Sequence, residues 1–341
     1  MNNGLSNIGF LFGAGTSLYA GYPLSRNLTV KVIEALTDSE KEILQNILTR
    51  ENLSIENQEE IPDIEKISDI IFKYSLSNDN QELKELENSV RDAIINIIKS
   101  VNEPNLDLHI KFFKSLKSII GPKARCIYIF TTNYDLSIEK AALYAKIPIF
   151  NGFAGTTFRF FDAERFKLTY GQIINRKFYE FAEPYIKLIK LHGSISWVKN
   201  GNSIFELGDL SAIKPSQSSI ILPKTQKIRD TLDYPYNHLF SYASRIIGSS
   251  QCRYLVSCGC SLRDEHINDH ILIPKLRANK IRLFATFKHA PTTIDQFQQF
   301  SSFNYLTETN NYIRGNLENG PSNLWDFNQF VNELAEKAGI E

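Results

Sequence analysis

The chain has 341 residues, of which 43% are hydrophobic and 12% aromatic, and its 38 basic and 38 acidic side chains cancel to a net charge of zero. That length can bury a large core, as one domain with insertions or as two moderate domains. A balanced charge excludes a strong overall attraction to nucleic acid or to an anionic membrane. Residues 1–17 lack the basic region of a signal peptide, and no run approaches the roughly 20 apolar residues that cross a bilayer. We therefore expect a cytoplasmic protein without direct contact to nucleic acid or membrane.

The four cysteines are Cys126, Cys252, Cys258 and Cys260. Three of them lie in or beside apolar segments, which is typical of reduced, buried thiols. A zinc ribbon needs paired C-x-x-C elements, and this sequence has none. His266 and His270 lie four residues apart on a predicted helix and could bind a metal, but the glutamate of a zinc-protease motif is missing, so a solvated helix face is favoured. We expect no zinc-ribbon module and no bound metal.

Short apolar runs that end in glycine or polar turns alternate with longer helical patterns along the chain. The first strand, residues 8–12, leads into a glycine turn and a helix over 25–36. A helical insertion over about 37–120 follows, because isoleucine, leucine and valine recur there at helical spacing. The second strand, 126–130, is followed by an alanine-rich helix and by a loop-rich cover over about 147–185.

The rest of the chain continues this alternation. Strands are predicted at 185–191, 219–222, 254–258, 281–286 and 303–306, and helices at 235–249, 264–279 and 324–338. Strand, turn and helix in this order predict an α/β fold, in which a Rossmann-like parallel sheet carries helices on both faces. We expect a single domain over 1–341 that includes the helical insertion.

Four of these strands end in small or polar residues, and in an open parallel sheet such ends share the edge where ligands bind. The first end is Gly13-Ala14-Gly15-Thr16-Ser17. Its glycines would let the backbone approach a pyrophosphate held by turn amides and the helix dipole. Leu18 replaces the third glycine of the usual dinucleotide spacing, so a tight turn without a ligand remains an equal alternative.

The second end places an amide and a carboxylate two residues apart, at Asn133 and Asp135. These side chains could face a ligand, or they could simply form the turn and cap the next helix. The third end is His192-Gly193-Ser194. A histidine there can orient or deprotonate a hydroxyl near neutral pH, although a structural histidine is the more common case.

The fourth end begins at Gly259. Gly259 and Ser261 could hold the other half of a dinucleotide, and Asp264 could cap the helix that follows. Ser261 is not expected to act as a nucleophile, because Arg263 stands where a hydrolase elbow needs glycine.

In this order and at these separations, the four ends resemble the sirtuin family of NAD-consuming proteins over about residues 8–268. The residues that resemble its motifs are Gly13–Ser17 with Gly21-Tyr22-Pro23 and Arg26, then Thr132–Asp135, Leu191–Gly193 and Gly259–Ser261. The resemblance implies that NAD is bound by Gly13, Ala14, Gly15, Ser17, Pro23, Arg26, Thr132, Gly259 and Ser261. It also implies that Arg26 lies on a loop closing over the reactive end.

Three departures separate this sequence from the protein-deacylating sirtuins. Those proteins carry a zinc module shortly after the histidine, and here no cysteine follows His192 before Cys252. The segment 220–224, Ile-Ile-Leu-Pro-Lys, stands where their acyl-lysine strand lies, and Ser25 replaces a loop aromatic. The pattern is similar to the zinc-free sirtuin-like domains of bacterial antiphage systems. That resemblance implies an NAD glycohydrolase that depletes NAD in abortive infection.

The implied reaction cleaves NAD, as substrate, to ADP-ribose and nicotinamide through an oxocarbenium-like sugar. Asn133 would hold water or the nicotinamide ribose, and Asp135 would support the nicotinamide or the developing charge. His192 would fix the ribose hydroxyls or act as base. Two alternatives remain open: a protein deacylase or ADP-ribosyltransferase, and a non-catalytic sensor or assembly subunit that binds NAD or ADP-ribose.

Regulation is expected as well, because a constitutively active enzyme of this kind would poison its host. We expect a homo-oligomer controlled by a separately encoded partner, such as a HerA-type ATPase or an Argonaute-like protein.

Overall fold

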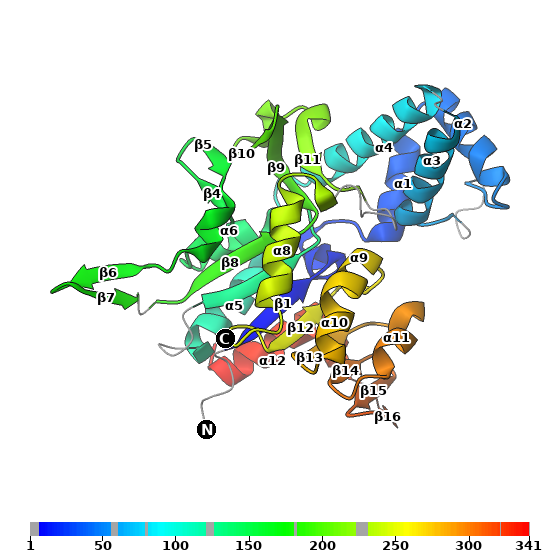
Figure 1. Ribbon diagram of the computed structural model, residues 1–341. Helices are drawn as coiled ribbons and strands as arrows, with labels where there is room; N and C mark the ends of the chain where they lie inside the picture. Colours follow the sequence, from blue (N-terminus) through cyan, green and yellow to red (C-terminus); the bar gives the residue numbers. More distant parts are fainter. Residues whose placement is uncertain are drawn as a thin grey trace.

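The computed structural model describes residues 7–55, 61–78, 81–120, 126–180, 183–222, 231–320 and 322–340. Within these ranges a central sheet has the strand order β16-β15-β14-β13-β12-β1-β2-β8-β3 (Figure 1). Its strands are β1 (Ile8–Phe12), β2 (Cys126–Thr131), β3 (Ile149–Phe150), β8 (Tyr185–Lys190), β12 (Tyr254–Cys258), β13 (Arg282–Thr286), β14 (Phe303–Leu306), β15 (Asn310–Ile313) and β16 (Asn316–Asn319). Strands from β14 to β3 are parallel, and β15 and β16 continue the sheet antiparallel. The parallel sheet predicted from the sequence is confirmed.

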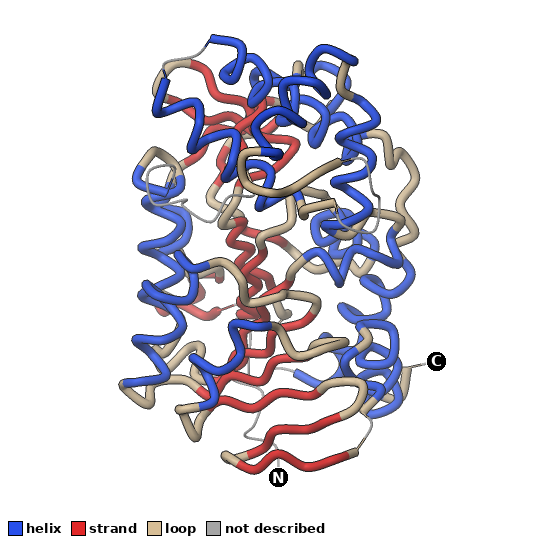
Figure 2. The backbone as a smooth tube through the Cα atoms, turned by 90° about the vertical axis from the view of Figure 1, so that its right-hand side faces the viewer, coloured by secondary structure: helices blue, strands red, loops and turns tan. Residues whose placement is uncertain are grey.

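Helices cover both faces of this sheet, so the central strands are buried on both sides and read as continuous apolar runs (Figure 2). Successive residues of β1 enter different cores: Leu11 lies in one and Phe12 in the other. The core around Phe12 is closed by α5 (Asp107–Ile120), α6 (Ser137–Tyr144) and α12 (Phe327–Ala338). The core around Leu11 is closed by α8 (Tyr236–Ile246), α10 (Ile273–Arg277) and α11 (Asp295–Gln298), while the short α9 (Glu265–Ile267) follows β12.

A helical bundle lies beyond one end of the sheet and has its own core (Figure 1). It consists of α1 (Ser25–Ala35), α2 (Asp38–Thr49), α3 (Ile64–Asn78) and α4 (Gln81–Lys99). The predicted insertion, 37–120, is therefore split between the bundle and the central sheet, because its last helix, α5, packs on the sheet through Phe112 and Phe113. Helical periodicity reveals an apolar face but does not tell which surface that face meets.

A second, antiparallel sheet accompanies the central one, with the order β11-β9-β10-β5-β4. Its strands are β4 (Phe153–Ala154), β5 (Phe158–Phe161), β9 (Gly193–Asn200), β10 (Ser203–Leu207) and β11 (Ser218–Ile220), and a separate hairpin consists of β6 (Gly171–Ile174) and β7 (Lys177–Glu180). β11 overlaps the strand predicted at 219–222. The other strands occupy the predicted loop-rich cover, 147–185, and the stretch 193–207, where the sequence predicts no strand. They are short, and several expose one face: Phe158 is 68% exposed, whereas Phe161 is buried.

The cysteines are free thiols, as the sequence predicts. Burial raises the pKa of Cys126 to about 11 and that of Cys252 and Cys258 to about 12, so they remain protonated near neutral pH. In the ranges described above, no helix has both the length and the apolar character that a membrane crossing requires.

Candidate functional site

The four polar strand ends meet along one edge of the central sheet, because β12, β1, β2 and β8 are consecutive parallel neighbours. Backbone hydrogen bonds join the ends: Gly13 N–H donates to Cys258 O (3.1 Å), and Thr132 N–H donates to Phe12 O (3.2 Å). Leu191 N–H donates to Thr131 O (2.8 Å). The chain builds outward from β1 through β2 to β8 and then returns to the other side of β1 with β12. Such a reversal is where open α/β sheets form a ligand crevice.

Glycines hold the loops after β1 and β12 in backbone contact. The N–H of Gly15 donates to Gly259 O (2.9 Å), and a Cβ on Gly259 would lie 2.4 Å from Thr16 N. Gly259 also has a φ of +62°, which favours glycine. The amides of Gly13 and Gly15 therefore donate to the backbone carbonyls of Cys258 and Gly259, whereas the sequence predicts that amides of this turn hold a phosphate. Ala14 and Ser261, which belong to the same two loops, are exposed to solvent.

Asn133 ties the loop after β2 to the loop after β1. Its side-chain Nδ2 donates to Gly13 O (3.0 Å) and to Ser17 Oγ (3.0 Å), and Thr16 Oγ1 lies 3.3 Å away. The hydroxyl of Ser17 in turn donates to Asp135 Oδ2 (2.8 Å). The structure thus brings three of the predicted site residues, Ser17, Asn133 and Asp135, into one buried hydrogen-bonded cluster.

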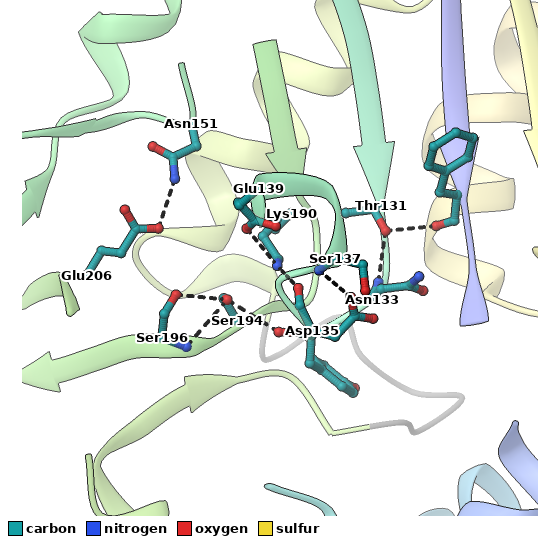
Figure 3. A network of polar contacts seen from close by, with 12 residues as sticks. Thr131, Asn133, Asp135, Ser137, Glu139, Asn151, Lys190, Ser194, Ser196 and Glu206 are labelled. Atoms are coloured by element: carbon teal, nitrogen blue, oxygen red, sulfur yellow. Dashed lines mark hydrogen bonds and ion pairs between the residues drawn. The ribbon is translucent and has the colours of Figure 1, made fainter. Parts of the chain in front are cut away.

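Neighbouring residues hold both the carboxylate and the backbone of Asp135 (Figure 3). Its Oδ1 accepts from the N–H of Ser137, the first residue of α6, at 2.8 Å. The carboxylate thus binds a first-turn amide, as predicted, but the N-cap residue is Leu136 and not Asp135. The carbonyl oxygen of Asp135 accepts from Nζ of Lys190, a lysine that is 1% exposed. Lys190 also pairs with Glu139 at 2.9 Å. A buried ion pair therefore fixes the backbone that carries Asp135.

Two buried titratable side chains face this carboxylate. Burial, and then the negative charges of Asp135 and Glu139, raise the pKa of Tyr22 well above its usual value. Burial lowers the pKa of His109 on α5 to about 4, although the charge of Asp135 acts in the opposite direction. His109 packs its ring 5.3 Å from that of Phe327, and among the described residues neither of its nitrogens has a hydrogen-bond partner. His109 is therefore neutral near pH 7.

His192 lies beside an acidic residue from the fourth strand end. Its Nε2 is 2.8 Å from Oδ2 of Asp264, and the two side chains are only 5% and 11% exposed. The contact is an ion pair when the imidazole is protonated. Oδ1 of Asp264 accepts from Ile267 N–H (3.1 Å), which confirms the predicted cap of α9. A buried carboxylate beside an imidazole can hold the ring in place and stabilise its protonated form.

The sequence did not reveal Asp264 as the neighbour of His192. The two residues are far apart along the chain and come together only because β8 and β12 flank β2 and β1. The usable signal was an acidic residue close behind Gly259, at the same sheet edge as the histidine.

The remaining predicted NAD-binding residues are less buried than the cluster. Thr132 is half-buried at the end of β2, and Pro23 is half-buried just before α1. Arg26 is exposed in the first turn of α1, although the resemblance places it on a loop.

The histidine pair on the helix after β12 does not form a metal cluster. The ring of His266 lies 4.5 Å from that of Phe240 and 4.7 Å from that of His270. No group of three or more His, Cys, Asp or Glu side chains in the described parts of the chain is arranged to hold a metal ion.

Comparison with protein families gives a match over the second and third strand ends and beyond. A family model described as a SIR2-like domain matches residues 128–300, slightly more than half of the 341 residues. The matched span includes Asn133, Asp135, His192 and the loop from Gly259 to Asp264, while the first glycine loop lies before it. A search of curated proteins found no match.

Proposed function

Because the chain belongs to the SIR2-like family, we propose that it is an NAD glycohydrolase, which cleaves NAD to ADP-ribose and nicotinamide. The family supports an NAD-related enzyme in general. The observation that carries the finer proposal is the buried cluster of Ser17, Asn133 and Asp135 beside the His192–Asp264 pair, at the reversal point of the sheet. These are polar groups held rigidly in a mostly apolar frame, as electrostatic stabilisation of a charged transition state requires.

The reaction does not require a covalent bond between the substrate and the protein. The bond from ribose C1 to the nicotinamide nitrogen breaks, and its electron pair leaves with neutral nicotinamide. A water oxygen then bonds to C1 and gives up a proton. The protein has to hold the water, stabilise the positive sugar and accept or relay the proton.

Each side chain of the cluster suits one of these tasks. Nδ2 of Asn133 is engaged inside the cluster, which leaves its Oδ1 to accept a hydrogen bond from water or from a ribose hydroxyl. Both oxygens of Asp135 already accept hydrogen bonds, so it would act through its negative charge on the oxocarbenium-like sugar. His192, paired with Asp264, would position the ribose hydroxyls or take the proton from water.

The segment around Ile220 favours hydrolysis over transfer to an acylated protein, because it stands where the deacylating sirtuins have their acyl-lysine strand. Ile220 pairs with Gly193, and Ile221 N–H donates to His192 O (2.9 Å), so this segment of the chain lies against the histidine motif. Ile221 O also accepts from the hydroxyl of Tyr134 (2.5 Å). Pro223 and Lys224, named with this segment in the sequence, lie outside the described residues.

The proposal extends to an abortive-infection effector in antiphage defence that is controlled by assembly or by a separately encoded partner such as a HerA-type ATPase or an Argonaute-like protein. Unregulated NAD hydrolysis would damage the host, so control is needed. The hairpin β6–β7 supports an assembly role, since it projects from the body (Figure 1) and exposes 75% of Ile173 and 54% of Phe178.

The test measures nicotinamide and ADP-ribose released from NAD by the purified protein, alone and with candidate partners. Asn133→Ala and His192→Ala should abolish release while leaving the fold intact, whereas His289→Ala, on an exposed histidine elsewhere, should not change it. Full activity in both site variants would refute the assigned site. NAD consumption only with an acylated or acceptor protein would indicate a transferase, and saturable NAD binding without turnover would indicate a sensor.

A further inference from the structure

A cavity of about 220 Å³ opens at the free edge of β11. It lies between α4, β9, β11 and the segment that leads into α8. Arg91, Lys199, Ser218, Asp233 and Tyr236 are among the residues that line it. None of its lining residues belongs to the glycine loops or to the polar cluster, so the cavity is distinct from the candidate site.

Two polar groups of this cavity lack hydrogen-bond partners within the described ranges. Arg91 donates from Nη2 to Ser218 O (2.5 Å), but its Nε is buried and unpartnered. Oγ of Ser218 is likewise buried and unpartnered, in a residue that is 1% exposed. Buried polar groups are normally satisfied, so the unpartnered Nε of Arg91 and Oγ of Ser218 are consistent with a ligand that binds them.

The charge of the lining selects the kind of ligand. Arg91 and Lys199 contribute two positive charges and Asp233 one negative charge, so the cavity is net positive. A guanidinium beside a lysine is the combination that binds phosphate. Asp233, together with the polar Ser216 and Gln217, adds groups that can bind hydroxyls. The volume is below the usual 300–1,000 Å³ of drug-sized sites, which limits the ligand to roughly the size of a sugar phosphate.

We propose that this cavity binds a small phosphorylated sugar, with its phosphate on Arg91, Lys199 and Ser218 and its hydroxyls on Asp233. The site does not depend on NAD cleavage. It does adjoin the proposed active site, because Ile221, which also lines the cavity, hydrogen-bonds through its backbone to His192. A bound ligand would therefore touch the strand that supports the histidine.

The test is calorimetric titration of the intact protein with ribose 5-phosphate at constant ionic strength. The wild type should give saturable binding, and Arg91→Gln should weaken it about tenfold or more, as expected for loss of a charged hydrogen bond. Lys199→Gln, on an exposed side chain, and Ser218→Ala should each weaken it less, and they keep the test valid if Arg91→Gln does not fold. Lys114→Gln, which removes the same charge from an exposed position on α5, is the matched control.

The outcomes separate this site from the proposed active site. Binding that survives Asn133→Ala but not Arg91→Gln supports the proposal. Binding lost with Asn133→Ala and kept with Arg91→Gln would place the sugar phosphate at the NAD site and overturn it. Equal weakening by Lys114→Gln, or no saturable heat in the wild type, would overturn it as well.

Discussion

Gly259 offers the sharpest test of how the loops after β1 and β12 are held together. In Gly259→Ala the new Cβ would lie 2.4 Å from Thr16 N and 2.7 Å from the carbonyl carbon of Gly15. These are backbone atoms, and they cannot move away without breaking the Gly15–Gly259 hydrogen bond. The left-handed φ of +62° adds a conformational penalty of about 1–2 kcal/mol for any residue with a Cβ. Overpacking adds a further 1–3 kcal/mol or so, giving a loss of about 2–5 kcal/mol in the free energy of unfolding.

Gly201→Ala is the matched control. Gly201 has a nearly identical φ of +60°, but no atom lies within 4 Å of a Cβ built there. Its alanine variant should lose only the conformational part, about 1–2 kcal/mol. Urea denaturation followed by far-ultraviolet circular dichroism gives both values, and their difference isolates the contact between the loops. Equal losses in the two variants would show that the loops do not touch, and would remove the basis of the site geometry.

Asp264→Asn keeps a cap for α9 but removes the charge beside His192, so kcat for NAD cleavage should fall about 100-fold with KM nearly unchanged. The exposed Asp269→Asn is its control, and an unchanged kcat in Asp264→Asn would contradict the pairing. His109 is buried neutral with a pKa of about 4, below its unfolded value near 6.5, so the unfolded state takes up the proton first and stability falls as the pH drops through this window. Between pH 7 and pH 5 the wild type should lose about 2 kcal/mol from this group, and His109→Phe should abolish that loss in urea denaturation at the two pH values; an equal loss in both proteins would show that His109 is not the group responsible.

The strands of the central sheet were predictable because they are buried on both faces. The ranges 8–12, 254–258 and 303–306 have the same bounds in sequence and structure. A strand covered by helices on both sides must be apolar at successive positions, and few other elements of that length are. In the second sheet β11 overlaps the strand predicted at 219–222, but the other strands were not predictable in this way. β9, Gly193–Asn200, mixes serine, lysine and tryptophan, and its pairing depends on β10 and β11, which follow later in the chain.

The candidate site was predictable as a set of residues but not as a set of pairs. The motifs identify Ser17, Asn133, Asp135 and His192, while the contacts Ser17–Asp135 and His192–Asp264 depend on which strands become neighbours. One signal was present and not used. Lys190 stands in an apolar strand that is buried along its length, and a buried ammonium needs an acceptor. The structure supplies Glu139 and the carbonyl of Asp135, so that lysine marks the position of the site from within the strand.

The span matched by the family model also leaves out part of what the site requires. It begins at residue 128, yet Asp135 is held by Ser17, and Asn133 is held by Gly13 and Ser17, from the loop after β1. Gly259, at the far side of the matched span, contacts that same loop. Because β1 lies between β2 and β12, its loop is the piece that joins the Asn133 cluster to the fourth strand end. The site is therefore a property of the whole sheet edge, and the first glycine loop contributes to it chiefly by fitting between its neighbours.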